Sequence, residues 1–204
     1  MHGLIIPDTS NLNDWSIIFD NWFKELETIL ELSNGKESPY IHAEHGNINL
    51  FSISASKAGF GTILELLGGN REGHNARLDL CMIAKNKLDI VEAKWLEFEC
   101  SKYIPREKII NIFKTALNDA KNYQNKNSIF VDRKKEIRKI GILFLSPYFE
   151  NMVNFKKVEQ LINLFSKSTV INYDLLAWSF PAKALHLKYW NRFYPGTIFI
   201  AKKI

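Results

Sequence analysis

Three charged residues lie within stretches of sequence whose other residues are mostly apolar. Asp79 lies in the stretch 76–84, and Glu92 and Lys94 lie in the stretch 88–96. A charge buried in a sheet without a partner is costly, so something must compensate these groups. Carboxylate oxygens are the ligands that a hard divalent cation such as Mg²⁺ prefers. The residue types and their placement therefore predict a metal site.

A β-hairpin is the element that must position these side chains. Strands are expected near 60–67, 76–84 and 88–96, because the hydrophobic pattern there has the period of a strand and turn residues separate the stretches. With a two-residue turn at 85–86, Asp79 faces Glu92 across the hairpin, and their Cβ atoms lie about 4.5–5.5 Å apart. Alternation along the strand puts Lys94 on the same face as Glu92. A bulge would shift the register and bring Lys94 opposite Asp79 instead.

The rest of the chain predicts helices on both sides of this hairpin in sequence. Apolar residues at three- and four-residue steps predict helices at 12–33, 41–58, 104–123 and 154–167, and apolar runs predict strands at 140–145, 170–180 and at a terminal segment ending at 198–201. This order predicts an α/β fold with a central mixed β-sheet flanked by helices.

Glu44 is an acid near the start of the second predicted helix. It lies one turn before Ile48, which belongs to the apolar stripe of that helix. Acids are seldom fully buried without a partner, so a glutamate on this face is unusual. The alternative is a place in the first turn, where the helix dipole favours an acid. Both interpretations remain open from the sequence.

The arrangement of an acid-bearing helix, a strand with x-D and a hairpin partner with E-x-K resembles the PD-(D/E)XK nuclease superfamily. The resemblance is carried by Asp79, Glu92 and Lys94, with Glu44 as the additional acid, and it covers residues 41–123 together with the strand at 140–145. Leu78 stands where the family name has proline. The resemblance implies a restriction-endonuclease-like core within a nuclease domain at 38–204.

The resemblance also implies metal-dependent hydrolysis of phosphodiester bonds, with DNA as the favoured substrate. Asp79, Glu92 and the carbonyl of Ala93 would hold Mg²⁺ or Mn²⁺, with help from Glu44 directly or through water. Lys94 would orient or deprotonate the attacking water and stabilise charge on the phosphate. The alternative function is a non-catalytic subunit on the same scaffold that binds nucleic acid or another protein.

Charge along the chain favours a polyanionic partner. The net charge is +5, although residues 1–37 carry seven acids and only two lysines, so the remainder is strongly basic. Arg133, Lys134 and Lys135, followed by Arg138 and Lys139, contact phosphate or lie in a solvated loop, with neither interpretation preferred. Arg77 contacts substrate or pairs with a nearby acid, and pairing is favoured. Aromatic residues alternate with cations between residues 178 and 203, which suits either base stacking or a core strand.

Residues 1–37 are expected to form an acidic amphipathic helix appended to the domain at 38–204. This helix either docks a partner, in a homodimer or a larger protein complex, or packs on the core with a solvated acidic face, and the second interpretation is favoured. Two cysteines, Cys81 and Cys100, are too few for a disulfide framework. No signal peptide and no long apolar run is recognisable, so a cytoplasmic protein without a membrane span is expected.

Overall fold

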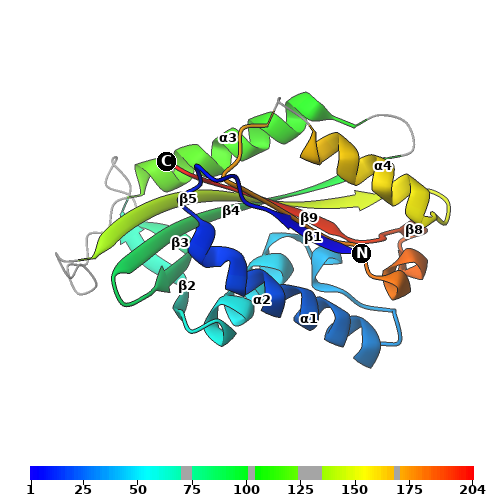
Figure 1. The fold of residues 1–204 in the computed structure, drawn as a ribbon, viewed down its shortest axis with the longest axis horizontal. Coiled ribbons are helices and arrows are strands. Elements are labelled where there is room, and N and C mark those ends of the chain that lie inside the picture. Colours follow the sequence, from blue (N-terminus) through cyan, green and yellow to red (C-terminus); the bar gives the residue numbers. More distant parts are fainter. Residues whose placement is uncertain (70–74, 101–103, 124–134, 168–170) are drawn as a thin grey trace.

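The computed structural model describes residues 1–69, 75–100, 104–123, 135–167 and 171–204. Its helices are α1 (Ser16–Leu32), α2 (Ala43–Lys57), α3 (Arg106–Asn122) and α4 (Phe155–Ser166), with short 3-10 helices η1 (Asn13–Trp15), η2 (Pro39–Ile41) and η4 (Ala182–His186). Its strands are β1 (His2–Ile5), β2 (Gly61–Gly69), β3 (Asn75–Ile83), β4 (Lys87–Glu99), β5 (Glu136–Tyr148), β6 (Leu175–Ser179), β7 (Lys188–Tyr189), β8 (Arg192–Phe193) and β9 (Thr197–Lys203). The chain is an α/β protein built on a mixed sheet (Figure 1).

Seven strands form the main sheet in the order β1-β6-β9-β5-β4-β3-β2. β2, β3 and β4 form the predicted antiparallel meander, and β4 pairs with β5 in parallel. The parallel pair needs a crossover connection, and α3 supplies it between the two strands. β7 and β8 form a separate two-stranded hairpin.

The hydrophobic spacing of each helix explains which face it buries. Buried α1 residues recur at helical steps, as do buried α3 residues. α1 and α2 cover one face of the sheet, and α3 and α4 cover the other (Figure 1). Alternate residues of β4 divide accordingly: Val91 and Ala93 join the core under α1 and α2, and Leu96 and Phe98 join the core under α3 and α4.

Residues 1–37 contribute to the same core as the rest of the chain. Trp15, Phe19 and Trp22 are fully buried and belong to one cluster with Phe51 of α2 and Phe199 of β9. β1 also pairs with β6, so the start of the chain closes one edge of the sheet. The apolar side of α1 is therefore used inside this molecule, and its acids lie on the outer side.

The helices and the meander lie close to the ranges predicted from the sequence. β5 is longer than the expected strand at 140–145, and it includes Arg138 and Lys139, for which the sequence favours phosphate contact and a solvated loop equally. β1 and the β7–β8 hairpin were not predicted, because segments of two to four residues carry too little periodicity to indicate a strand. Among the described residues, no helix is long and apolar enough to cross a membrane.

Candidate active site

The regular pairing of β3 is interrupted at Asp79. The β2–β3 register runs from Gly61↔Ile83 to Leu64↔Leu80, skips Glu65 and Asp79, and resumes at Leu66↔Leu78. Glu65 has a φ of 52°, in the left-handed region that residues other than glycine seldom adopt. The β3–β4 ladder ends at Leu80↔Val91, just before Asp79. Asp79 thus lies where β3 separates from β4.

The predicted two-residue turn is confirmed, because the Ala84 N–H donates to the Lys87 carbonyl at 2.9 Å. The predicted register is also confirmed, since the recorded pairs run from Ile83↔Leu88 to Leu80↔Val91 and lead to Asp79 and Glu92 as the next positions, although the ladder itself ends just before them. Asp79 Oδ2 instead accepts a hydrogen bond from the Ala93 N–H at 2.7 Å. The carboxylate takes the place that a backbone carbonyl of β3 would hold in a continued ladder.

Lys94 binds the other backbone group of Ala93. Its Nζ donates to the Ala93 carbonyl at 3.0 Å and forms an ion pair with Asp119 Oδ2 of α3 at 3.1 Å. The carbonyl that the resemblance assigns to a metal is therefore bound by an ammonium group. Burial alone would lower the pKa of Lys94, but the bond to Asp119 and the charge of Glu44 outweigh it and raise that pKa. Lys94 is consequently cationic at neutral pH.

Glu92 is almost completely buried, at 7% exposure, on the same face of β4 as Lys94. Burial is the main reason that its pKa rises to about 9, and the charge of Asp79 and a side-chain hydrogen bond to Asp79 add to the rise. Two carboxyl groups this close cannot both ionise without a cation between them. Glu92 therefore keeps its proton at neutral pH.

Glu44 approaches the same group from α2, where it lies in the first turn and is partly buried. Burial raises its pKa; the charge of Lys94 opposes this effect and the charge of Asp79 adds to it. Glu44 and Asp79 line a cavity of about 380 Å³ together with His45, Asn49 and Glu65. The structure thus brings Glu44 to the predicted hairpin residues and supports its first-turn interpretation.

Asp119 was not singled out from the sequence, and the packing of α3 explains how it reaches Lys94. Gly141 of β5 is the parallel-register partner of Glu92, and a Cβ at Gly141 would lie 2.8 Å from the Leu117 backbone nitrogen. α3 can approach β5 this closely only because position 141 has no side chain. Leu117 is two residues from Asp119, so this contact sets the position of the Lys94 partner.

The group as a whole carries more acid than base. Asp79, Glu92, Glu44 and Asp119 surround a single lysine, Lys94. Among the described residues, no three His, Cys, Asp or Glu side chains converge closely enough to hold a metal ion by themselves. Mg²⁺ commonly uses only one or two carboxylates and keeps several waters. Asp79, Glu92 and the Ala93 carbonyl are therefore the groups that could serve as protein ligands of such a cation, with Glu44 near enough to contribute through water.

The other candidate residues have separate outcomes. Arg77 pairs with Glu65 at 2.7 Å on the surface, as the favoured interpretation predicted. Arg133 and Lys134 lie outside the described residues, and Lys135 is partly exposed just before β5. Lys139 is not a phosphate contact in this structure, because its Nζ donates at 2.8 Å to the carbonyls of residues 121 and 123 at the end of α3.

Arg138 is also not a phosphate contact, because it is buried at the centre of an ion network. Its guanidinium donates to both carboxylate oxygens of Asp89 at 2.6 Å and to Asp14 at 2.8 and 3.0 Å. Trp15 Nε1 donates to Asp89 at 2.9 Å, and Lys87 pairs with Asp14 at 3.2 Å. This network fastens the start of α1 to β4 and β5. Opposite charges at the paired positions 89 and 138 are the signal that could have revealed it.

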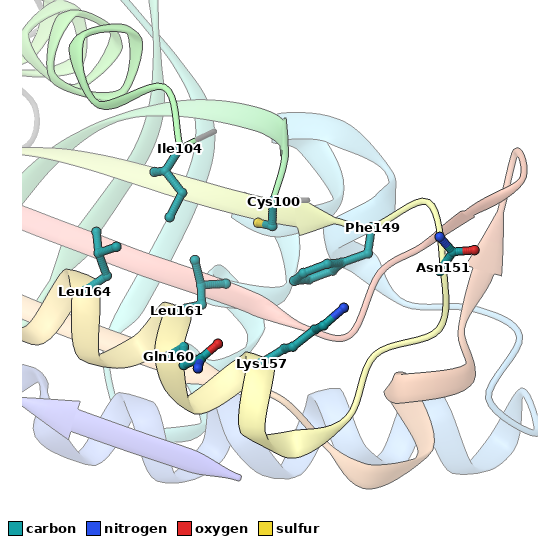
Figure 2. Close-up of a pocket in the computed structure, with 8 residues that line it drawn as sticks. All are labelled: Cys100, Ile104, Phe149, Asn151, Lys157, Gln160, Leu161 and Leu164. Carbon is teal, nitrogen blue, oxygen red and sulfur yellow. The ribbon is translucent and has the colours of Figure 1, made fainter. Parts of the chain in front are cut away.

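A second cavity, of about 360 Å³, lies beside α4 on the opposite face of the sheet from α1 and α2 (Figure 2). Figure 2 shows Leu161 and Phe149 pointing into it, with Lys157 at its rim and Cys100 behind them. Burial raises the pKa of the Cys100 thiol to about 12, so the thiolate needed for nucleophilic attack is not formed at neutral pH. This cavity contains none of the predicted site residues.

Comparison with known proteins adds no relative: no protein-family model, curated protein or solved structure matches this chain.

Proposed function

We propose that this chain is a metal-dependent nuclease that hydrolyses phosphodiester bonds, with DNA as the favoured substrate. The observation that carries the proposal is the convergence of Asp79, Glu92 and Glu44 around Lys94 at the place where β3 separates from β4. The interrupted ladder at β3 supports it, because the Ala93 carbonyl there accepts a hydrogen bond from Lys94 Nζ and not from a neighbouring strand. The restriction-endonuclease-like core is part of the same proposal.

Each residue of the group has a role in this proposal. Asp79 and Glu92, with the Ala93 carbonyl, would hold the cation, and Glu44 would contribute through water. Lys94 is charged at neutral pH, so it serves as a cation that orients the attacking water and stabilises negative charge on the phosphate. Asp119 fixes the position of the Lys94 ammonium. Bound Mg²⁺ or Mn²⁺ would neutralise phosphate charge and make water a stronger acid.

The proposed partner is nucleic acid, since the chain is basic outside residues 1–37. DNA is preferred to RNA on the resemblance alone, and the proposed location is the cytoplasm. A homodimer or a larger complex would use the acidic outer side of α1, because the apolar side of that helix is buried in the core.

The test is a cleavage assay with the isolated protein on plasmid, linear duplex, single-stranded DNA and RNA, in Mg²⁺, in Mn²⁺ and in EDTA. Wild type is expected to cleave in either metal and not in EDTA. Asp79→Asn and Lys94→Ala are each expected to lower the rate about 100-fold or more, because each removes charge from the reacting centre. Circular dichroism and thermal unfolding would verify that both variants fold.

Lys57→Ala is the matched control for Lys94→Ala. Lys57 is also a lysine paired with an acid, Glu25, but it lies on the surface at the end of α2. Its removal is expected to leave the cleavage rate unchanged. Absence of cleavage by wild type on every substrate, or full activity in folded Asp79→Asn, would overturn the proposal in favour of a non-catalytic binding subunit.

A further inference from the structure

The β7–β8 hairpin presents a tryptophan to solvent at its tip. Tyr189 pairs with Arg192, and the two residues between them, Trp190 and Asn191, have φ values of 48° and 61°. Such a turn needs two residues in the left-handed region, where asparagine and glycine are preferred and tryptophan is not. The Trp190 side chain is nevertheless 78% exposed and buries little apolar area in return. A strained backbone that displays an aromatic ring points to a use for the ring.

The hairpin is held firmly to the sheet rather than projecting as a loose loop. Arg192 forms an ion pair with Glu97 of β4, and its guanidinium lies 4.3 Å from the centre of the Tyr148 ring of β5. Phe193 forms a β-bridge with Phe149, directly after β5 (Figure 1 shows β8 at this end of the sheet). The position of Trp190 is therefore fixed relative to β4.

Two contacts connect this hairpin to the elements of the candidate active site. Glu97, which pairs with Arg192, lies three residues beyond Lys94 on β4, about 10 Å along the strand, and on the opposite face, the one that α2 and Glu44 cover. The Tyr189 ring lies 6.2 Å from the ring of His42, two residues before Glu44. A strand of nucleic acid at the site would need only a few nucleotides to reach Trp190, at about 3.4 Å for each stacked position.

The chemistry of the hairpin suits bases and phosphates together. Tyr189 and Trp190 present adjacent rings, 6.1 Å apart, and Lys188 is exposed with its Nζ 5.7 Å from the Phe193 ring centre. Aromatic rings stack on the faces of unpaired bases, and neighbouring cations follow the backbone. Bases inside a duplex have their faces covered by their neighbours, so a duplex offers this ring little to bind.

We infer that Trp190 stacks on an unpaired base and makes the hairpin a binding platform for single-stranded nucleic acid next to the candidate active site. This inference deepens the proposed nuclease function and rests on it for its biological meaning. It predicts that the hairpin binds unpaired bases, and this binding can be measured without cleavage.

The test measures binding of a fluorescein-labelled oligothymidylate by fluorescence anisotropy, in EDTA so that no cleavage occurs. Trp190→Ala is expected to weaken binding about 5- to 100-fold, and Trp190→Phe, which keeps an aromatic face, to recover most of the affinity. A strand of the same length without bases is expected to bind wild type and Trp190→Ala equally. Oligothymidylate is also expected to quench the tryptophan fluorescence of wild type and to quench that of Trp190→Ala much less, since Trp190 is exposed, Trp15 and Trp22 are fully buried, and Trp95 and Trp178 are partly buried.

Leu32→Ala is the control for loss of an exposed apolar side chain, because Leu32 is 81% exposed at the far end of α1. It is expected to bind oligothymidylate as wild type does. Unchanged affinity in Trp190→Ala, or an equal loss on the strand without bases, would overturn the inference. So would tight binding to phosphatidylglycerol vesicles that Trp190→Ala abolishes while oligothymidylate binding is unaffected.

The two proposals fail separately. If Asp79→Asn abolishes cleavage while Trp190→Ala binds normally, the nuclease proposal stands and the stacking inference is wrong. If wild type cleaves nothing but shows base-dependent binding through Trp190, the stacking inference stands and the nuclease proposal is wrong.

Discussion

Two clusters of charged side chains lie three residues apart on β4, and they differ in how their charges are balanced. In the network around Asp89, two acids meet Arg138 and Lys87, and the guanidinium binds both oxygens of Asp89. In the candidate site beyond it, four acids meet one lysine, and the buried Glu92 keeps a proton that an ordinary carboxyl would lose. One β-strand thus carries a neutral cluster on one face and an acidic cluster on the other.

The two clusters differ in what they need from outside the protein. A buried ion pair with complete hydrogen bonding needs nothing from outside, and it serves to fix the packing of its elements. A buried acidic cluster without enough cations is stable only with bound protons or bound metal. The first arrangement fastens the start of α1 to the sheet, whereas the second contains more acids than bases.

The largest expected effect comes from breaking the balanced cluster. Arg138→Met should lower the free energy of unfolding by about 3–5 kcal/mol, because it leaves the buried Asp89 without its partner. Urea denaturation at neutral pH measures this loss. Lys57→Met, which breaks an exposed ion pair with Glu25, should cost about 1 kcal/mol or less. Equal losses in the two variants would contradict the structural role of the Asp89 network.

Neutralising one acid of the acidic cluster should raise the free energy of unfolding, whereas breaking the balanced cluster should lower it. Because the pKa of Glu92 is higher in the folded than in the unfolded chain, its contribution to stability falls as pH rises from the unfolded value toward about 9. Glu92→Gln removes this loss. In EDTA, the free energy of unfolding of the variant should therefore rise relative to that of wild type by on the order of 1–3 kcal/mol as the pH is raised from 5.5 to 8.

Urea denaturation of both proteins at the two pH values provides the measurement for Glu92. Glu107→Gln, a change in the first turn of α3 at an exposed glutamate, is the control and should show no such pH dependence. A difference between Glu92→Gln and wild type that stays constant with pH would mean that Glu92 is already ionised in the folded protein.

The smallest expected effect concerns Asp119, the positioning residue for Lys94. Asp119→Asn should lower cleavage about 10-fold, as changes to supporting residues commonly do. It should also lower the pKa of Lys94, because it removes the bond that raises that pKa, and so move the alkaline limit of activity to lower pH. A pH–rate profile separates this from a general loss of fold, which would lower the rate equally at every pH.

The sequence predicted much of this arrangement but not its details. The meander and its turn followed from strand periodicity and two polar turn residues, so Glu92 and Lys94 could be assigned to one face. The separation of β3 at Asp79 was not predictable, because it depends on the left-handed backbone at Glu65 and on pairing that the chain pattern does not encode. Asp119 was missed because its role depends on the close contact of α3 with Gly141, 22 positions along the chain.

The buried position of Arg138 was also not predictable from the sequence pattern. Its neighbours in sequence are basic, and a cluster of cations predicts a solvated or phosphate-binding loop. Only the parallel register, which pairs residue 138 with Asp89, reveals that this arginine is inside the protein.

The central claim is that the acidic cluster on β4 is a divalent cation site, and Mn²⁺ titration followed by electron paramagnetic resonance tests it most directly. At pH 7.5, wild type should bind Mn²⁺ and release protons, while Glu92→Gln should bind it far more weakly. Asp89→Asn, a change in the balanced cluster, should bind Mn²⁺ as wild type does if it remains folded. Mn²⁺ binding that is absent in wild type, or equally strong in Glu92→Gln, would contradict the claim.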